Sequence, residues 1–509
     1  MKCSSSNPAR CGRSRRHFLG TTLGAGLAAA VGSVSPSSGS ASAYPVPGFL
    51  AQGGTLEKIR LGSVSCGGRA GELMSQFTAQ KEIRLIAVSD PDSARVDAVQ
   101  KKYEGVEGYR NLRELLDRGD LDAVLVATCN HWHCLGAILA MQAGCHVYVE
   151  KPLSHSQWEG RQTVLAARKY GKVCQVGMQQ RSDPMQAEIK AFLHEEKAIG
   201  MLRSGRINRY GIRGSIGRLD VPLTPPATVD YNLWLGPAQE LPIYRKSFHY
   251  DWHWDWNTGS GEMGNWGVHV IDDFRNNVLL DKPTLPLRVM AGGGRVVWND
   301  AGESPNVHFV YYDTGSIPCV LGLSNIPARP GEKSSAGACT GPGSGYVAFG
   351  EGGRLEGQRG SAVAFDADGK ELRRFRGNGG GDLHAKNFIE AIQTNDPSIL
   401  RAEVSLGNDS AGWCNLANIA YRCGKAFSDQ TADSLNGKTD GRWEELLGQT
   451  RRLLADNGID PAAADSNVWI SPMLTLDPAT QRFTGDDAER ANSFLKREYR
   501  KEFEVPDFE

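Results

Sequence analysis

The sequence carries almost no net charge and, beyond its N-terminus, no long apolar segment. Its 57 Lys and Arg residues balance 58 Asp and Glu residues, which excludes a polybasic protein whose partner is nucleic acid. After the N-terminal segment, no stretch reaches the roughly 18 consecutive apolar residues that a transmembrane helix needs. With 509 residues, of which 40% are apolar, we expect a globular protein with more than one hydrophobic core.

Cysteine pairs and metal-binding spacings are missing as well. The 11 cysteines are scattered and include no C-x-x-C pair, which excludes a disulfide framework. His131 and His133 stand beside Cys134, but their i, i+2 spacing puts them on different sides of a helix, so we predict no metal there. The Gly-rich residues 331–353 contain no G-x-x-x-x-G-K motif and are predicted to form a loop or turn region.

Residues 1–43 have the composition of an export signal. Ser14-Arg15-Arg16-His17-Phe18-Leu19 precedes a Gly- and Ala-rich stretch that is too short to span ~30 Å of hydrocarbon. Ala41-Ser42-Ala43 has the small-residue spacing of a cleavage site. The segment resembles a twin-arginine signal. This resemblance implies the twin-arginine export machinery as a partner, a periplasmic location, and a cofactor acquired before the folded protein is exported.

A dinucleotide site is predicted in the first domain. Strands at residues 59–65 and 83–89 flank the glycine turn Cys66-Gly67-Gly68-Arg69-Ala70-Gly71 and a helical pattern. Glycines let a pyrophosphate approach the backbone, and the helix N-terminus offers its free N–H groups to the anion. Asp90 ends the second strand, where a carboxylate binds the ribose hydroxyls and repels a 2′-phosphate. Asp90 therefore favours NAD over NADP, although Arg95 keeps NADP as the less favoured alternative.

Helical and strand patterns keep alternating through residues 111–150. Repeated strand–helix units predict a doubly wound parallel sheet. Ligands of such sheets bind beyond the carboxyl ends of the strands. Three predicted strand ends carry Asp90, Thr128-Cys129-Asn130 and Glu150-Lys151-Pro152, so we expect these residues to lie along one edge of the sheet.

These motifs resemble the Gfo/Idh/MocA family, which includes glucose–fructose oxidoreductase and inositol dehydrogenase. The resemblance is carried by Glu150-Lys151-Pro152, the glycine turn, Asp90 and Asn130-His131-Trp132-His133. It continues along the chain, since the family's sixth strand, its glycine-rich substrate helix and its returning C-terminal helices are similar to residues 172–178, 261–272 and 388–427.

The resemblance implies a fold and a domain order. We expect a Rossmann domain at residues 57–178 and an α/β domain with a large, mostly antiparallel sheet at residues 179–430, whose helices near 384–428 return to the first domain. Residues 431–509 would form a C-terminal extension. A homo-oligomer is expected by analogy, because the second domain often mediates assembly in this family.

The resemblance also implies a redox site between the two domains. Lys151 would lie beside the nicotinamide ribose and the substrate hydroxyl, and His269 matches the family's catalytic histidine. Asn265 stands where many members have an aspartate; a neutral amide can bind a sugar hydroxyl but cannot raise the pKa of His269 as a carboxylate would. The predicted cofactor-binding residues are Ser65, Gly67, Gly68, Arg69, Ala70, Asp90, Thr128, Asn130, His133, Glu150 and Lys151, and the predicted substrate-binding residues are Arg181, Asn265 and Asp272.

These residue types suit the oxidation of a secondary alcohol. A hydride leaves carbon while a base takes the hydroxyl proton, and a base works best with a pKa near ambient pH, as histidine has. Asn265, His269 and Asp272 are spaced i, i+4 and i+7, so we expect all three to point from one helix face toward the cofactor. Our hypothesis is that His269 is the base and that Lys151, whose pKa should be lowered by burial, polarises the hydroxyl or relays its proton.

Export would restrict the reaction, because the periplasm holds no pool of free NAD. The cofactor would have to stay tightly bound and be recycled in place. We therefore expect an exported NAD-dependent oxidoreductase acting on a sugar or sugar-derivative hydroxyl. The alternatives are an NAD-dependent glycosidase, which oxidises the sugar, eliminates the aglycone and returns the hydride, and a non-catalytic sugar-binding protein.

Residues 249–256 alternate strictly between polar and aromatic side chains. The alternation predicts a strand with a His and Asp face and an aromatic face. Same-side residues of a strand lie ~6.6 Å apart, so a metal would reach only two of them and no metal site is expected. The tryptophans could stack on sugar rings, but packing in a core or an interface is favoured because large aromatics are usually buried.

Overall fold

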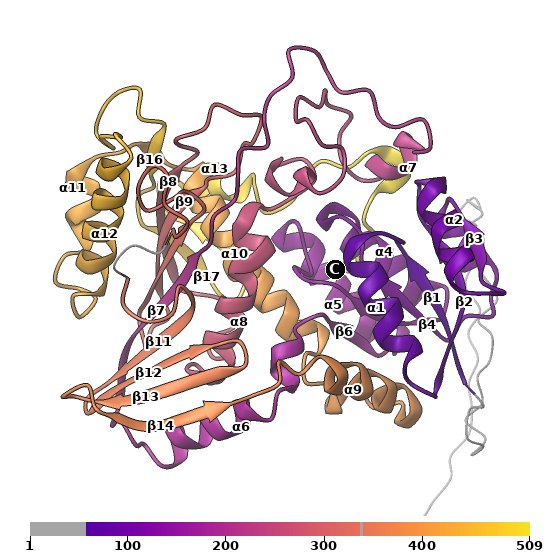
Figure 1. Ribbon diagram of the computed structural model, residues 1–509, viewed down its shortest axis with the longest axis horizontal. Coiled ribbons are helices and arrows are strands. Elements are labelled where there is room, and N and C mark those ends of the chain that lie inside the picture. Colours follow the sequence, from indigo (N-terminus) through magenta and orange to yellow (C-terminus); the bar gives the residue numbers. More distant parts are fainter. Residues whose placement is uncertain (1–57, 336–338) are drawn as a thin grey trace, which may run out of the picture. The chain divides into compact units, whose positions relative to one another are not determined.

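The computed structural model describes residues 58–335 and 339–509. The predicted signal at residues 1–43 lies outside the described residues. Two sheets dominate the described chain, a parallel one near its start and a larger mixed one after it (Figure 1). Within these described ranges, no helix is both long and apolar enough to cross a bilayer.

The first sheet is six-stranded and wholly parallel, in the order β3-β2-β1-β4-β5-β6. Its strands are β1 (Ile59–Val64), β2 (Ile83–Ser89), β3 (Glu107–Tyr109), β4 (Ala123–Val126), β5 (His146–Val149) and β6 (Cys174–Val176). The strand order reverses between β1 and β4, and a crevice for ligands forms at such a switch point. The predicted doubly wound parallel sheet is confirmed.

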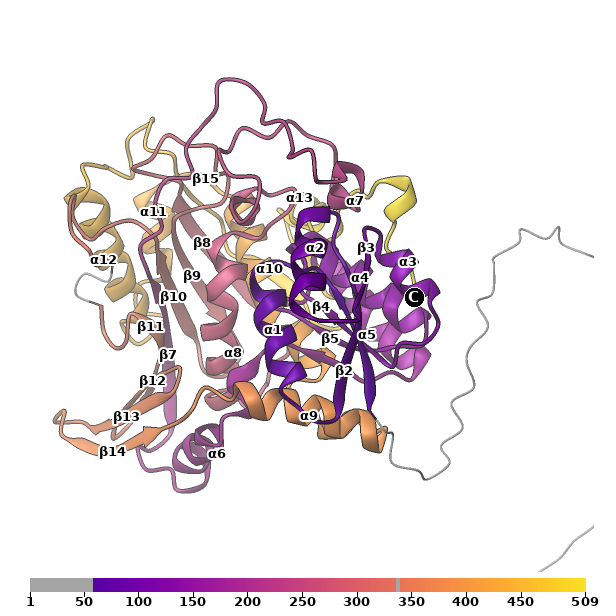
Figure 2. The same cartoon turned by 45° about the vertical axis from the view of Figure 1, so that its right-hand side comes forward.

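Helices cover both faces of this sheet, which explains why its central strands are apolar on both sides. They are α1 (Gly68–Thr78), α2 (Ser93–Lys102), α3 (Leu112–Asp117), α4 (Asn130–Gln142) and α5 (Gln157–Tyr170). A late helix, α9 (Gly381–Thr394), returns to lie beside α1 (Figure 2). The ring of Phe388 packs edge-on against Phe77 of α1, with 6.0 Å between ring centroids.

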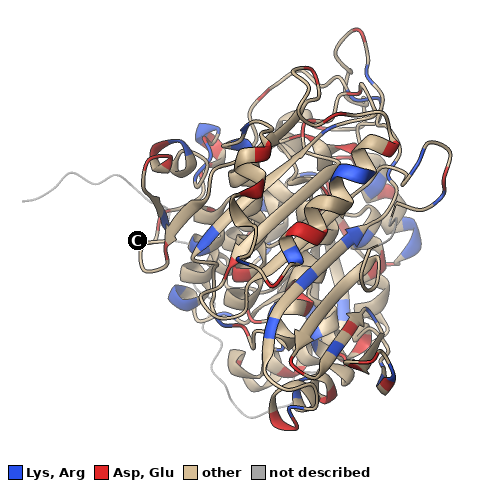
Figure 3. Cartoon of the chain, turned by 90° about the vertical axis from the view of Figure 1, so that its left-hand side faces the viewer, with Lys and Arg blue, Asp and Glu red and all other residues tan. Residues whose placement is uncertain are grey.

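The second sheet has twelve strands, and all pairs except β7 with β10 are antiparallel. Its strands are β7 (Leu202–Tyr210), β8 (Arg288–Gly294), β9 (Val307–Asp313), β10 (Cys319–Ser324), β11 (Ser344–Gly350), β12 (Gly353–Gln358), β13 (Ser361–Asp366), β14 (Glu371–Arg376), β15 (Lys425–Ala426), β16 (Val468–Ile470), β17 (Leu474–Asp477) and β18 (Arg482–Thr484). The large, mostly antiparallel sheet is thus confirmed. Basic and acidic residues are interspersed on the face shown in Figure 3, as in the Arg354–Glu356 pair of β12.

Two helices, α8 (Val268–Asn277) and α10 (Val404–Arg422), lie between the two sheets (Figure 1). Every residue of α8 is buried, and so are most residues of α10. A helix with no solvent-facing side belongs to the interior of a protein. These helices therefore join the two sheets through one continuous core.

Residues 431–509 take part in both halves. Helix α12 (Arg442–Asp456) covers the second sheet, where the Trp443 ring packs near Phe309 of β9, and β16 and β17 pair with β8. After α13 (Ala488–Asn492), residues 493–509, which we call the tail, return to the first domain. There the Phe503 ring contacts Trp132 of α4 at 5.6 Å between centroids.

Two predictions of local structure are wrong. Residues 249–256 are not a strand, because Tyr250 adopts a left-handed φ of 72° and Asp251–Trp254 form a 3-10 helix. The His253 ring stacks on Trp252 at 3.7 Å. The alternation in the sequence therefore reflects rings that pack against each other locally, and not the two faces of a strand. Within the predicted loop at 331–353, Ser344–Gly350 form strand β11, which pairs with both β7 and β12.

Candidate cofactor and active site

The glycine turn after β1 fits an anion. Gly67 caps α1 without any side-chain hydrogen bond, and in the first turn Ala70 N–H donates to the Gly67 carbonyl at 2.9 Å. The other N–H groups at the start of a helix have no partner inside it and face outward with the positive end of the helix dipole. Gly68 has a φ of 44°, and a Cβ there would meet nothing within 4 Å. At Gly67 a Cβ would lie 2.3 Å from the Arg95 guanidinium. The turn thus offers an open backbone cradle for a pyrophosphate.

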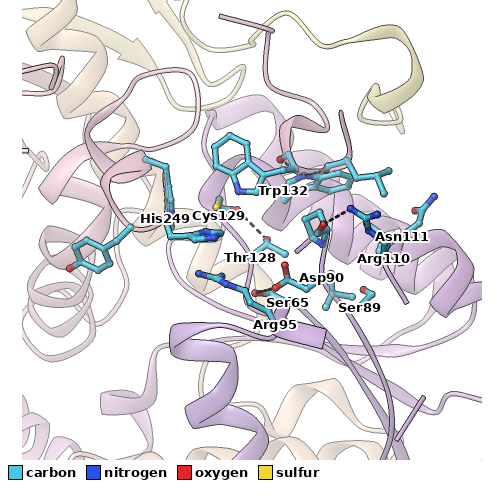
Figure 4. A pocket seen from close by; sticks show the side chains of 17 residues that line it. Ser65, Ser89, Asp90, Arg95, Arg110, Asn111, Thr128, Cys129, Trp132 and His249 are labelled. Atoms are coloured by element: carbon cyan, nitrogen blue, oxygen red, sulfur yellow. Dashed lines mark hydrogen bonds between the residues drawn. The ribbon is translucent and has the colours of Figure 1, made fainter. Parts of the chain in front are cut away.

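Asp90 lies at the carboxyl end of β2 in the position predicted for ribose binding. Its buried carboxylate accepts hydrogen bonds from the backbone N–H groups of Cys66 at 2.9 Å and Asp92 at 3.0 Å. Burial raises the pKa of Asp90, against the effect of these donors. Asp90 lines a pocket together with Ser65 and Arg95 (Figure 4). The acid that favours NAD and the arginine that leaves NADP as an alternative therefore lie in the same pocket.

A segment of the second half closes over this pocket. Residues 228–253, which we call the strap, include α7 (Tyr231–Leu235) and pair with the loop after β2. The Asp230 N–H donates to the Pro91 carbonyl at 2.8 Å, and the His249 ring lies 3.2 Å from the Asp92 carboxylate. Strap residues, including His249 and Trp234, line the pocket. The pocket is therefore walled by both halves of the chain.

Hydrogen bonds from the tail hold the strap in place. Arg500 donates to the carbonyl oxygens of Asn232 at 3.1 Å and Gly236 at 3.3 Å. Arg497 donates to the Asn257 carbonyl at 3.1 Å, just beyond the strap. The C-terminal residues thus contact the chain segment that covers the cofactor edge, a relation that no pattern in the sequence indicates.

Lys151 follows β5 and lies at the border of the two halves. Its Nζ donates to the backbone carbonyl of Asn265 at 2.9 Å. Burial lowers the pKa of the Lys151 amine, although the Glu150 carboxylate opposes this. Glu150 accepts a hydrogen bond from Arg69 at 2.9 Å; burial alone would raise its pKa, but Arg69 and Lys151 hold that pKa below its usual value.

Three of the predicted cofactor residues connect neighbouring loops. The His133 ring lies 2.7 Å from the Pro152 carbonyl and 3.1 Å from that of Thr128, so it joins the loops after β4 and β5. The Asn130 side chain accepts a hydrogen bond from Ser260 at 3.0 Å. These contacts position the site's loops, and direct contact of His133, Asn130 and Thr128 with the cofactor stays a prediction. Ala70 is buried in α1.

His269 lies at the start of α8, directly after a π-helical turn at Met263–Gly267, an irregularity that is common at functional sites. Its ring packs edge-on against Trp266 at 5.6 Å. Burial, followed by the cations of Arg359, Lys151 and others, lowers the pKa of His269 well below its usual value. The expected pKa near ambient pH is therefore not met, because burial first and the nearby cations second disfavour the charged imidazolium.

The expectation that Asn265, His269 and Asp272 share one face is wrong. The Asp272 carboxylate is buried and accepts hydrogen bonds from Arg181 at 2.8 and 2.9 Å, and from Ser410 at 2.7 Å. A buried guanidinium requires such counter-charges, so Arg181 and Asp272 satisfy each other inside the protein instead of facing the site. Only Asn265 among the predicted substrate residues lies next to Lys151.

Sequence reasoning missed a set of side chains around Trp266. Glu262 is fully buried and accepts hydrogen bonds from Arg209 at 2.7 Å, Arg213 at 3.3 Å and Asn265 at 3.0 Å. The guanidinium groups of Arg209 and Arg359 lie over the Trp266 ring. Glu262 and Trp266 stand within the glycine-rich stretch that drew attention to His269. The arginines carry no local signal, because Arg209 lies in β7, Arg213 just after it, and Arg359 in the turn between β12 and β13.

The fold and this edge together define an α/β protein with a dinucleotide-binding Rossmann domain and a second domain completing the site. Residues 60–178 match a model of an oxidoreductase family described as its NAD-binding Rossmann fold, and residues 216–323 match the C-terminal alpha/beta domain of the same family. Both domains of the chain thus match models of one oxidoreductase family, Gfo/Idh/MocA, the family that the sequence motifs resemble.

Curated relatives match the chain in part. An alpha-N-acetylgalactosaminidase from Shewanella oneidensis is 31% identical over 176 residues, which cover 31% of this chain and 38% of the relative. Inositol 2-dehydrogenase 2 from Saccharopolyspora erythraea is 30% identical over 162 residues, covering 31% of this chain and 45% of that enzyme. The chain thus matches less than half the length of each relative.

Solved structures share the fold. The WlbA dehydrogenase from Bordetella pertussis, solved in complex with NADH and UDP-GlcNAcA, superposes with a TM-score of 0.53 at 16% identity, over 71% of this chain and 96% of that one. A biliverdin reductase from Synechocystis, in complex with biliverdin and NADP+, gives 0.51 at 16% identity over 72% and 99%. At this level of identity the likeness concerns the fold alone.

Proposed function

We propose that the protein is an NAD-dependent oxidoreductase that acts on a hydroxyl of a sugar or sugar derivative. The observation that carries the proposal is that Lys151 Nζ, at the carboxyl edge of a Rossmann sheet, donates to the Asn265 carbonyl, four residues before His269, and that the Lys151 cation contributes to the lowered pKa of His269. The dehydrogenases among the relatives support the reaction class. Asp90 supports NAD as the cofactor, with NADP less favoured.

The residues at this site fit a dinucleotide, and different side chains would bind the cofactor and handle the substrate's proton. The Gly67–Gly68 turn would hold the pyrophosphate and Asp90 the adenosine ribose, and the bound nicotinamide would supply the hydride acceptor. Lys151 Nζ hydrogen-bonds the substrate oxygen and favours its deprotonated form. A ring nitrogen of His269, kept neutral by its lowered pKa, takes the hydroxyl proton. The substrate carbon loses a hydride, the oxygen loses a proton, and a carbonyl remains.

Export and a permanently bound cofactor belong to the same proposal. The twin-arginine signal proposed for residues 1–43 would place the protein in the periplasm, where only a retained cofactor could turn over repeatedly. The strap and tail support retention, because the pocket beside Asp90 has walls from both halves of the chain. A homo-oligomer remains part of the proposal by analogy with the family.

A second candidate is an NAD-dependent glycosidase, which would use the same site to oxidise, eliminate and reduce. The relative from Shewanella oneidensis and the glycosyl hydrolase family 109 proteins favour it. Purified protein incubated with nitrophenyl glycosides, without added NAD, separates the two candidates. Release of nitrophenol supports the glycosidase, whereas bleaching or growth of the bound nicotinamide absorbance without release supports the oxidoreductase.

A further inference from the structure

The substrate side of the site holds more cations than carboxylates. Arg209 and Arg213 share the single carboxylate of Glu262, and Arg69 is paired with Glu150. Lys151 donates to a neutral carbonyl. Buried or half-buried charges are costly unless an opposite charge lies close, so this arrangement is suited to a ligand that brings negative charge.

Arg359 is the cation with the least compensation. In the part of the chain that the structure describes, its guanidinium makes no ion pair within 4 Å, and it lies 5.9 Å from the centre of the Trp266 ring. The buried carboxyl of Asp273 is nearby, but burial raises its pKa to about 7, so it is a poor counter-charge at neutral pH. Arg359 is only half-buried, which leaves it accessible to a ligand.

The fold fixes Arg359 in place. It lies at the tip of the β12–β13 hairpin, between the paired residues Gln358 and Ser361. The hairpin tip is anchored because Gly377 N–H donates to the Gly360 carbonyl at 2.9 Å. Trp266 connects the two sides of the site, since its ring lies 5.9 Å from the Arg359 guanidinium and 5.6 Å from the His269 ring.

We propose that Arg359, beside Trp266, forms a subsite for an anionic group on the substrate, so that the preferred substrates are sugar acids or sugar phosphates rather than neutral sugars. This inference rests on the proposed function and refines it. A guanidinium binds carboxylate and phosphate in the same bidentate way, and an aromatic face can hold the adjoining sugar ring. The subsite lies within one ring contact of His269, which places the anion close to the reacting hydroxyl.

The test compares sugars that differ at one carbon. Glucose, glucuronate and glucose 6-phosphate are offered to the holoprotein, and reduction of the bound nicotinamide is followed. We expect the wild type to favour at least one anionic sugar over glucose by about tenfold or more. Arg359→Gln should lower the ratio of kcat/KM for that anion to kcat/KM for glucose about 30-fold or more. The two anionic substrates separate a carboxylate subsite from a phosphate subsite.

Arg354→Gln is the matched control. It removes a guanidinium from the same hairpin, where Arg354 is paired with Glu356 and lies over Phe365. Its substrate preference should equal that of the wild type. An equal loss for neutral and anionic sugars in Arg359→Gln would overturn the subsite, and so would loss of the copurifying nucleotide, which would assign Arg359 to the cofactor's phosphates instead.

Calorimetric binding keeps the subsite testable without turnover. If no sugar is oxidised, the proposed function fails, but wild-type protein should still bind glucuronate or glucose 6-phosphate more tightly than glucose, and Arg359→Gln should lose this difference. Equal binding of all three sugars by the wild type would overturn the subsite whatever the fate of the proposed function.

Discussion

The cofactor edge and the substrate wall of this protein are built in different ways. The cofactor edge consists of loops that directly follow consecutive strands, so Gly67, Asp90 and Lys151 are placed by local sequence and by the sheet order. The substrate wall gathers Arg209, Trp266 and Arg359 from a strand, a π-helical turn and a hairpin. Local motifs are enough to find the first, whereas tertiary structure is needed for the second.

The two regions also differ in electrostatics. On the cofactor edge Arg95 is paired with Asp92, and the Asp90 carboxylate accepts hydrogen bonds from backbone N–H groups. On the substrate wall positive charge is in excess, and His269 has its pKa lowered by burial and by these cations. The edge thus offers a pyrophosphate mainly backbone N–H groups, whereas the wall offers an anion guanidinium groups.

Removing the reactive groups gives the largest expected effect and tests both regions together. Lys151→Ala and His269→Ala should each reduce kcat by ~10²-fold or more, because each removes a group that handles the hydroxyl proton. Released nucleotide, measured after denaturation, should stay at the wild-type level in His269→Ala. Activity within a few-fold of wild type in both variants would reject the assignment of these residues to the chemistry.

Removing the ribose acid affects the cofactor edge alone. Asp90→Ala should weaken NAD retention by about tenfold or more, because the lost hydrogen bonds to a charged acceptor are worth roughly 1.5–3 kcal/mol. The nucleotide that copurifies, measured by mass spectrometry, should fall or shift toward NADP. The control is Asp122→Ala, which removes a carboxylate that is paired with Arg60 and lies just before β4, outside the loop that carries Asp90. Unchanged NAD content in Asp90→Ala would contradict the ribose role.

Loosening the strap gives a smaller effect. Arg500→Ala removes the donor to the Asn232 and Gly236 carbonyls and should speed NAD release several-fold, since a hydrogen bond at the protein surface contributes about 0.5–1.5 kcal/mol. Stopped-flow release of the nicotinamide signal measures it. The exposed neighbour Lys501 provides the control variant Lys501→Ala. If release is equally slow in both variants, the tail does not contribute to retention.

The pH dependence provides the finest distinction. His269 must be neutral to accept a proton, and its pKa is lowered well below 6.5. We therefore expect kcat to stay high through pH 6.5 and to decline only at a clearly lower pH. Lys151 acts protonated, and its pKa is lowered from 10.5, so activity should decline on the alkaline side before pH 10.5. A profile of kcat that halves near pH 6.5 would show that His269 has an ordinary pKa instead.

The sequence allowed the parallel sheet, the glycine turn and the acid after β2 to be predicted, because strand periodicity and glycine chemistry act over short distances. The fate of Asp272 could not be predicted, since its partner Arg181 comes from a different element and both are buried. The π-helical turn at Met263–Gly267 also changes the residue spacing before His269, so the i, i+4, i+7 rule of a regular α-helix does not apply to Asn265. Residues 249–256 misled because ring stacking mimics strand alternation.

A single-turnover experiment tests the central claim most directly. Protein purified without added nucleotide is mixed with a panel of neutral and anionic sugars, and the absorbance of the bound nicotinamide is followed in wild type, Lys151→Ala and His269→Ala. We predict that wild type carries one nucleotide and changes its redox state with at least one sugar, while both variants carry the nucleotide and react at least about a hundredfold more slowly. Folded wild-type protein that carries no nucleotide and binds none, or variants that react as fast as wild type, would contradict the account.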